Sequence, residues 1–138
     1  MKLGARRRTY LREATATLVI ARLAVRFMPA SRIFAWANRP LHRINRFAGD
    51  EVDWIFWAVE QIGARPWMNA LCLPSALAAH AMLRRRGIAS RLCLGVAREG
   101  RELAAHAWVE IGNDRIVRDA RVGRFTRLAE FGGVKVTR

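Results

Sequence analysis

The sequence contains little cysteine and no pattern of metal-binding residues. Only two cysteines occur among 138 residues, Cys72 and Cys93, and neither belongs to a CxxC pair or a cysteine–histidine cluster. We therefore expect no disulfide framework, no structural metal and no cofactor, and such cysteine usage is typical of a reduced, cytoplasmic protein. At 52% hydrophobic residues the chain can bury a core as one domain, residues 1–138.

Acidic side chains and lysine are also scarce. The chain has 11 Asp and Glu against 25 Lys and Arg, a formal charge of +14. Arginine carries nearly all of this charge, since the only lysines are Lys2 and Lys135. The excess favours an acidic partner such as an acidic peptide, an anionic membrane or nucleic acid, although an arginine-rich composition spread over the surface explains it equally well. No recognised nucleic-acid-binding motif accompanies the charge, so we expect no nucleic-acid partner.

Long uninterrupted hydrophobic runs are missing. "RRRTYLRE" near the N-terminus looks like a twin-arginine export signal, but Arg22 and Arg26 interrupt the apolar run "ATLVIARLAVRFM" that follows. The run is too short to span a bilayer and makes a poor signal-peptide core, so we expect no transmembrane segment. A basic amphipathic helix fits better. It could lie on a membrane or a partner, although such helices more often pack on their own domain.

The order of the expected elements indicates an α+β fold. Residues 1–48 form a basic helical region in which Pro29 and Pro40 delimit two helices. The remainder, 49–138, is the expected catalytic core. Its periodicity predicts helices over about 50–62 and 72–86, strands over 91–98, 103–111 and 115–120, and a further strand through "GVKVT" in the tail. Helices followed by an antiparallel sheet are the pattern of an α+β domain.

The helix that begins near Cys72 has signals at both ends. Pro74 suits a first turn, where its missing N–H costs nothing, and Gly87 suits the C′ position after an arginine-rich last turn. Cys72 therefore lies at a helix N-terminus, an environment that favours the thiolate. The alternative is that its thiol is a small buried hydrophobe, which is the more common role of a lone cysteine.

A second candidate group lies on the strand 103–111, where His106, Trp108 and Glu110 share one face. A turn with a two- or four-residue loop would pair residue 111 with residue 116 and place Asp119 diagonally across from His106.

A three-residue loop would put Arg118 in the place of Asp119 and remove the carboxylate. With the even loop, the sequence offers a cysteine nucleophile in Cys72, a general base in His106 and an orienting carboxylate in Asp119. The backbone N–H of Cys72 could also donate to an oxyanion.

Other residues compete weakly for these roles. Cys93 lies in mid-strand and is expected to be a core thiol, and His80 lies two helical turns from Cys72, too far to activate it. His42 has no evident partner, and Asp114 is expected to be a turn residue. Glu110 shares the face of His106 but lies two residues along the same strand.

Two longer stretches carry a family resemblance. "CLPSALAAHAMLRRRGIASRLCLGVA" and "AHAWVEIGND" resemble the transglutaminase-like leader peptidases of lasso-peptide biosynthesis over about residues 54–120. The resemblance implies a transglutaminase-like, papain-like core. It also implies a cysteine protease that removes the leader from a ribosomally made precursor peptide, with Cys72 as nucleophile, His106 as base and Asp119 as the orienting carboxylate.

The family also implies partners. The precursor's leader region would be the substrate, and an asparagine-synthetase-like lasso cyclase would use the amine that cleavage releases. Residues 1–53 show no strand-rich leader-recognition module, so a separate recognition protein is expected. Two alternatives remain open: a non-catalytic basic module that binds an acidic peptide or nucleic acid, and a transamidation that uses the same three residues.

Overall fold

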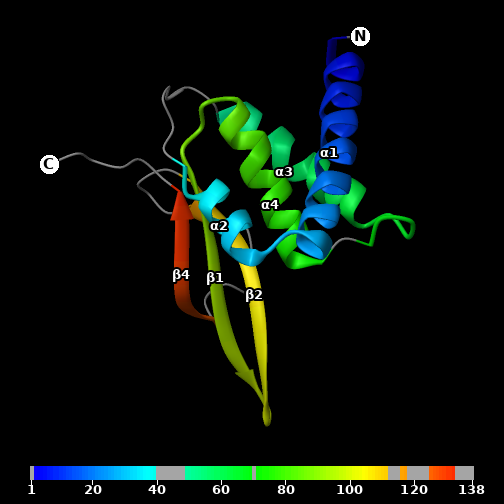
Figure 1. Ribbon diagram of the computed structural model, residues 1–138. Helices are drawn as coiled ribbons and strands as arrows, with labels where there is room; N and C mark the ends of the chain where they lie inside the picture. The colour runs from blue at the N-terminus through cyan, green and yellow to red at the C-terminus, as the bar shows by residue number, and fades with distance from the viewer. Residues whose placement is uncertain (1, 40–48, 70, 112–115, 118–124, 133–138) are drawn as a thin grey trace, which may run out of the picture.

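The computed structural model describes residues 2–39, 49–69, 71–111, 116–117 and 125–132 (Figure 1). The helices are α1 (Lys2–Phe27), α2 (Ala30–Ala37), α3 (Gly49–Gly63) and α4 (Cys72–Arg85), and the strands are β1 (Ser90–Glu99), β2 (Glu102–Ile111), β3 (Ile116–Val117) and β4 (Thr126–Gly132). The strands form an antiparallel sheet in the order β3-β2-β1-β4. Helices precede strands along the chain, so the predicted α+β class is confirmed.

The helical layer covers one face of the sheet, as Figure 1 shows for α4 beside β1 and β2. Because side chains alternate along a strand, each strand gives one set of residues to this layer and the other set to the opposite face. The sheet residues of the shared apolar core are Leu92, Leu94, Ala107, Val109, Ile111 and Phe131. We call this side of the sheet the helix-covered face.

The central helix of the layer is α4. All its residues from Ala76 to Leu83 are buried, because α1 and α3 pack on it from one side and the sheet from the other. Its C-terminal signals act as predicted: the helix ends at Arg85, and Gly87 has a left-handed φ of 72°. In α3, the apolar stripe predicted from the sequence is buried against this core at Val52, Ile55, Val59 and Ile62.

A buried histidine joins four elements at one end of α4. His80 donates from Nε2 to the carbonyl of Ala37 in α2 (2.9 Å) and accepts at Nδ1 from the hydroxyl of Ser90 in β1 (2.7 Å). Gly132 of β4 lies against the same ring, with no room for a Cβ between Ser90 and Ala37. Burial lowers the pKa of His80 to about 4, so the ring is neutral and its role is structural.

The last strand differs from the prediction. It is formed by "TRLAEFG", whereas the predicted "GVKVT" lies outside the described residues. A β-bulge opposite Leu94 and Gly95 shifts the register, so that Ala129 pairs with Leu94 and Arg127 with Gly95. The extra residue, Leu128, is exposed, and a period-two pattern cannot be read across it.

Candidate active site

The first residue of α4 is Cys72, as the sequence predicts. Its side chain is half-buried and packs against the apolar core of the helical layer. The amide N–H groups of a helix's first turn have no acceptor within the helix, so they can donate to a developing negative charge. This is the local environment that a nucleophilic thiol requires.

The segment before Cys72 is anchored to α1. Met68 is 1% exposed, and its carbonyl accepts a hydrogen bond from the guanidinium of Arg22. Asn69 then takes a left-handed conformation with a φ of 41°, which asparagine tolerates better than most residues. The buried side chain of Met68 and the left-handed turn at Asn69 fix the direction in which the chain enters α4.

The candidate base, His106, is a buried residue in the middle of β2. It pairs with Gly95 of β1, and Trp108 pairs with Cys93, so the predicted shared face of His106, Trp108 and Glu110 is confirmed. The imidazole lies 5.0 Å from the ring of Phe125 and 6.0 Å from the indole of Trp108, measured between centroids. The aromatic groups limit the orientations that the imidazole can take.

Gly95 makes this aromatic packing possible. A Cβ on Gly95 would lie 2.8 Å from the six-membered ring of Trp108 and 2.8 Å from the carbonyl oxygen of Thr126. Real Cβ atoms are not found at such distances, so any side chain here would displace the indole from its position beside His106.

Cys72 and His106 come from different layers of the fold. Cys72 begins α4 and packs against the apolar core of the helical layer, whereas His106 alternates along β2 with Ala107 and Val109, which belong to that core. Catalysis by this pair therefore requires the N-terminus of α4 to bring the thiol to the imidazole.

The third predicted residue, Asp119, lies outside the described residues. The register that leads to it is described in part: Ile111 pairs with Ile116, and Glu110 pairs with Val117. The predicted pairing of 111 with 116 is thus confirmed, and with it the even turn that the assignment needs. The role of Asp119 stays a prediction.

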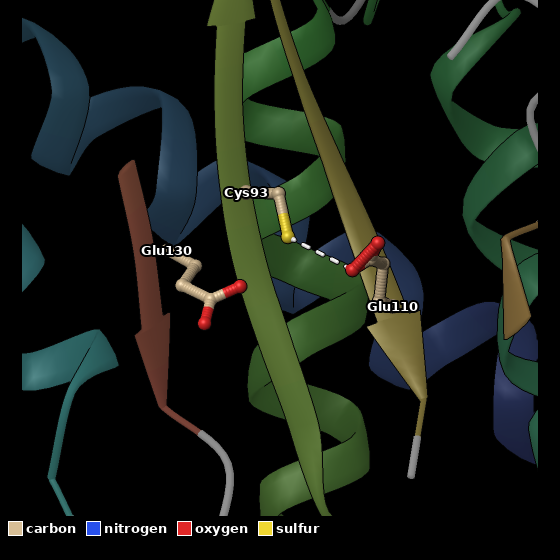
Figure 2. Close-up of side chains that lie close together, drawn as sticks. All are labelled: Cys93, Glu110 and Glu130. Atoms are coloured by element: carbon tan, nitrogen blue, oxygen red, sulfur yellow. Dashed lines mark hydrogen bonds between the residues drawn. The ribbon is translucent and has the colours of Figure 1, made fainter. Parts of the chain in front are cut away.

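A charged cluster that the sequence did not predict lies on the same face as His106 (Figure 2). Cys93 donates from Sγ to Oε2 of Glu110 at 3.5 Å. Arg127 forms an ion pair with Glu110 and another with Glu130, the latter at 2.7 Å. Glu110 is 2% exposed, so its charge depends on the guanidinium for compensation.

The thiol in this cluster is inert. Burial raises the pKa of Cys93 to about 12, and the carboxylate of Glu110 beside it raises the pKa further. Cys93 therefore stays protonated at neutral pH, and its predicted role as a core thiol is confirmed by its complete burial. This leaves Cys72 as the better candidate for a nucleophile.

The same cluster has the donor atoms of a small metal site. One ligand atom from each of Cys93, Glu110 and Glu130 lies within 4.8 Å of the others. A thiolate with two carboxylates suits zinc. Arg127 already neutralises both carboxylates, and the thiol is protonated, so a metal would have to displace the guanidinium and the thiol proton.

One comparison identifies the family. The profile described as "Transglutaminase-like superfamily" matches residues 14–130, which contain Cys72, His106 and Asp119. The chain belongs to the transglutaminase-like superfamily. Members of this superfamily are typically cysteine protease-like, so the coarse prediction of the family is confirmed. No curated protein and no solved structure gives a significant match.

The match gives this transglutaminase-like domain a defined extent. It begins at Ala14, within α1, and ends at Glu130, within β4. The helical layer and the sheet are therefore both part of the family's domain. Within the described residues, no helix combines the length and apolar character needed to cross a membrane.

Proposed function

We propose that this protein is a cysteine peptidase that removes the leader from a ribosomally made lasso-peptide precursor in the cytoplasm. The observation that carries the proposal is a half-buried cysteine at the first position of α4, in a chain of the transglutaminase-like superfamily. The resemblance of "AHAWVE" and of the α4 sequence to lasso leader peptidases supports the substrate class.

The first step is an acyl transfer to Cys72. The thiolate attacks the carbonyl carbon at the leader–core junction, and the backbone N–H of Cys72 donates to the resulting oxyanion. His106, protonated by the thiol, then gives its proton to the leaving nitrogen. The C–N bond breaks, the core peptide leaves with a free α-amine, and the leader stays attached to Sγ as a thioester.

The second step returns the enzyme to its starting state. Neutral His106 accepts a proton from water, the resulting hydroxide attacks the thioester, and the leader leaves as a carboxylic acid. Asp119 holds the imidazole in the productive tautomer throughout. In this scheme Glu110 has no role in proton transfer, since it is engaged by Arg127 and Cys93.

The proposal places three partners around the enzyme. The leader region of the precursor is the substrate, a separate recognition protein presents it, and an asparagine-synthetase-like cyclase joins the released α-amine to an acidic side chain. The formal charge of +14 favours an acidic leader or recognition protein.

The deciding experiment incubates a precursor peptide with the protein, with and without the recognition protein and the cyclase, and follows the products by mass spectrometry. We expect a single cut at the leader–core junction. Cys72→Ala should abolish it at an unchanged fold, whereas the matched variant Cys93→Ala should cut nearly normally. A cut that survives in Cys72→Ala would refute the proposal.

The same samples distinguish the alternatives. If an added amine becomes attached to the leader and no free acid forms, the reaction is a transamidation. If no combination of partners yields a product and the protein binds the acidic peptide with a steep dependence on salt, it is a binding module.

A second test asks whether Cys72 and His106 interact. If the imidazole pairs with the thiol, His106→Ala shifts the modification of Cys72 by iodoacetamide to higher pH, measured in the Cys93→Ala background. An identical pH profile in the presence and absence of the imidazole would show that the two groups do not interact.

A further inference from the structure

The C-terminal half of α1 carries apolar residues on the side that the domain covers and also on part of the side that faces solvent. Ala14, Leu18 and Ala21 point into the core and are buried. The outward side carries four exposed residues that we call the apolar ridge: Val19, Ile20, Leu23 and Phe27. Exposed apolar side chains gathered on one side of a helix are uncommon in a helix that only packs on its own domain, so the ridge indicates a second surface to which α1 binds.

The ridge is a stripe along the exposed side of α1. Ile20, Leu23 and Phe27 follow a helical spacing of three and four residues, and Ile20 and Phe27 are 65% and 73% exposed. In Figure 1, α1 lies at the side of the helical layer away from β4. The pocket of about 490 Å³ found near α1 is lined by residues outside the ridge: Gly4, Arg7, Asp53, Trp54 and Trp57.

The charged residues around the apolar ridge are almost all basic. Residues 1–39 contain nine Lys or Arg and a single acidic residue, Glu13. Glu13 is turned toward α4, where it accepts a hydrogen bond from Arg86 at 2.6 Å. Arg26 lies beside the ridge with its guanidinium 5.6 Å from the ring centre of Phe27, and Arg12 is exposed on the same helix.

An exposed tryptophan belongs to the segment that Arg22 of α1 binds. Trp67 is 61% exposed, and it directly precedes Met68, whose carbonyl is bound by Arg22 of α1. This hydrogen bond holds the segment that contains Trp67 against α1. Apolar side chains flanked by arginines and tryptophan are the composition of helices that lie in a membrane interface.

We propose that the apolar ridge of α1 docks this protein on an anionic lipid bilayer, with the helix lying in the plane of the interface. A lipid surface takes up exposed apolar side chains without a complementary groove. It also attracts many arginines at once without specific acceptors, which fits the one-signed charge better than a protein partner does. The proposal is independent of the peptidase activity.

The experiment is a flotation assay of the full chain with vesicles of phosphatidylglycerol and phosphatidylcholine in equal parts, and with vesicles of phosphatidylcholine alone. We expect the protein to float with the anionic vesicles at low salt. Leu23→Ser with Phe27→Ser should lower the partition coefficient at least about tenfold. Arg12→Gln with Arg26→Gln should lower it by a similar factor and weaken its salt dependence.

A matched control uses exposed leucines elsewhere. Leu103 and Leu128 are 71% and 67% exposed on the strands, so replacing both with serine removes similar apolar surface away from α1. This control should float like the wild type. Because all the substituted side chains are exposed, each variant should keep the wild-type circular dichroism spectrum and unfolding midpoint.

Three outcomes would overturn the proposal. The wild type could fail to float with the anionic vesicles. The variant with serine at Leu103 and Leu128 could lose as much vesicle binding as the ridge variant. Alternatively, light scattering could show a wild-type dimer that becomes a monomer in the ridge variant without any vesicle binding. The ridge would then be an interface between two copies of the chain.

Discussion

Three buried polar side chains near the sheet are each stabilised in a different way. His80 is neutral because burial lowers its pKa, and both ring nitrogens are hydrogen-bonded. Cys93 is neutral because burial and a neighbouring carboxylate raise its pKa. Glu110 forms an ion pair with Arg127. None of the three is available for proton transfer, which leaves Cys72 and His106 for the chemistry.

The first residue-scale prediction concerns pH and His80. In the unfolded chain the imidazole protonates near its ordinary pKa of 6.5, whereas in the fold it stays neutral down to about 4. The unfolded state therefore binds the proton first as the pH falls, and stability decreases between these two values. At pH 5 this group should lower the free energy of unfolding by about 2 kcal/mol relative to pH 7.

Urea unfolding of the wild type and of His80→Gln over this pH range measures the effect. Other groups titrate in both proteins, so the contribution of His80 is the difference between the two curves. Between pH 7 and pH 5, the free energy of unfolding of the variant should fall by about 2 kcal/mol less than that of the wild type. Two parallel curves would show that His80 is not kept neutral by the fold.

The second residue-scale prediction concerns the two thiols. In the folded protein, iodoacetamide should modify half-buried Cys72 and leave Cys93 unmodified, because Cys93 is buried and protonated. Both should react in denaturant. Peptide mapping by mass spectrometry reads each site separately, and equal modification of the two thiols in the native state would contradict the assignment.

At the scale of elements, the strand β4 is held by a glycine. Gly132 has a φ of +98°, and a Cβ there would lie 2.8 Å from the Ser90 carbonyl and 3.0 Å from that of Ala37. Gly132→Ala should therefore lower the free energy of unfolding by about 2–3 kcal/mol, through both backbone strain and steric overlap.

Gly100 offers a matched control for this substitution. It also has a positive φ, +64°, but a Cβ there would meet nothing within 4 Å. Gly100→Ala should cost only about 1 kcal/mol, the conformational part alone. Chemical unfolding of both variants separates the two contributions, and equal losses would show that the contact with α2 and β1 is not tight.

A helix or strand could be predicted from the sequence where its own residues mark its ends or its periodicity. Pro29 separates α1 from α2, Gly87 follows α4, and the alternation of Leu92 and Leu94 marks β1. The strand β4 was not predicted, because its bulge breaks the period-two pattern and Leu128 points to solvent. Local signals describe elements well, whereas a bulge depends on the partner strand.

The candidate site was predictable only in part for the same reason. The position of Cys72 at a helix start and the face of His106 follow from spacing along one element. Whether the thiol and the imidazole meet depends on which face of the sheet α4 covers, and the period of the sequence alone does not determine this. The Glu110–Arg127 pair joins residues 17 positions apart through the bulged register of β4.

At the scale of the whole molecule, the N-terminal helix and the rest of the chain share one core. Tyr10, Ala14 and Leu18 of α1 are buried in the same cluster as α4 and the sheet. Arg86 lies 4.8 Å from the ring centre of Tyr10 and also pairs with Glu13, so α1 is bound to the end of α4 by charge as well.

This shared core predicts that residues 49–138 do not fold alone. Without α1, the fragment exposes the apolar side of α3 and α4 that α1 covers, and about 25 cal/mol of stabilisation is lost for each Å² of apolar surface left in water. We expect thermal unfolding followed by circular dichroism to show a cooperative transition for the full chain and none for the fragment. A fragment with a sharp transition would mean that the basic region is a separate unit.

The contacts between α2 and β4 have a consequence for synthesis on the ribosome. The amide of Gly132 donates to the side chain of Asn38, 94 residues earlier, and Phe34 stacks on Phe131 at 4.6 Å. Translation proceeds from the N-terminus, so α2 emerges long before the strand that covers it. Phe34 therefore stays uncovered until β4 has been made, and a nascent chain stalled before β4 would be a natural target for chaperones.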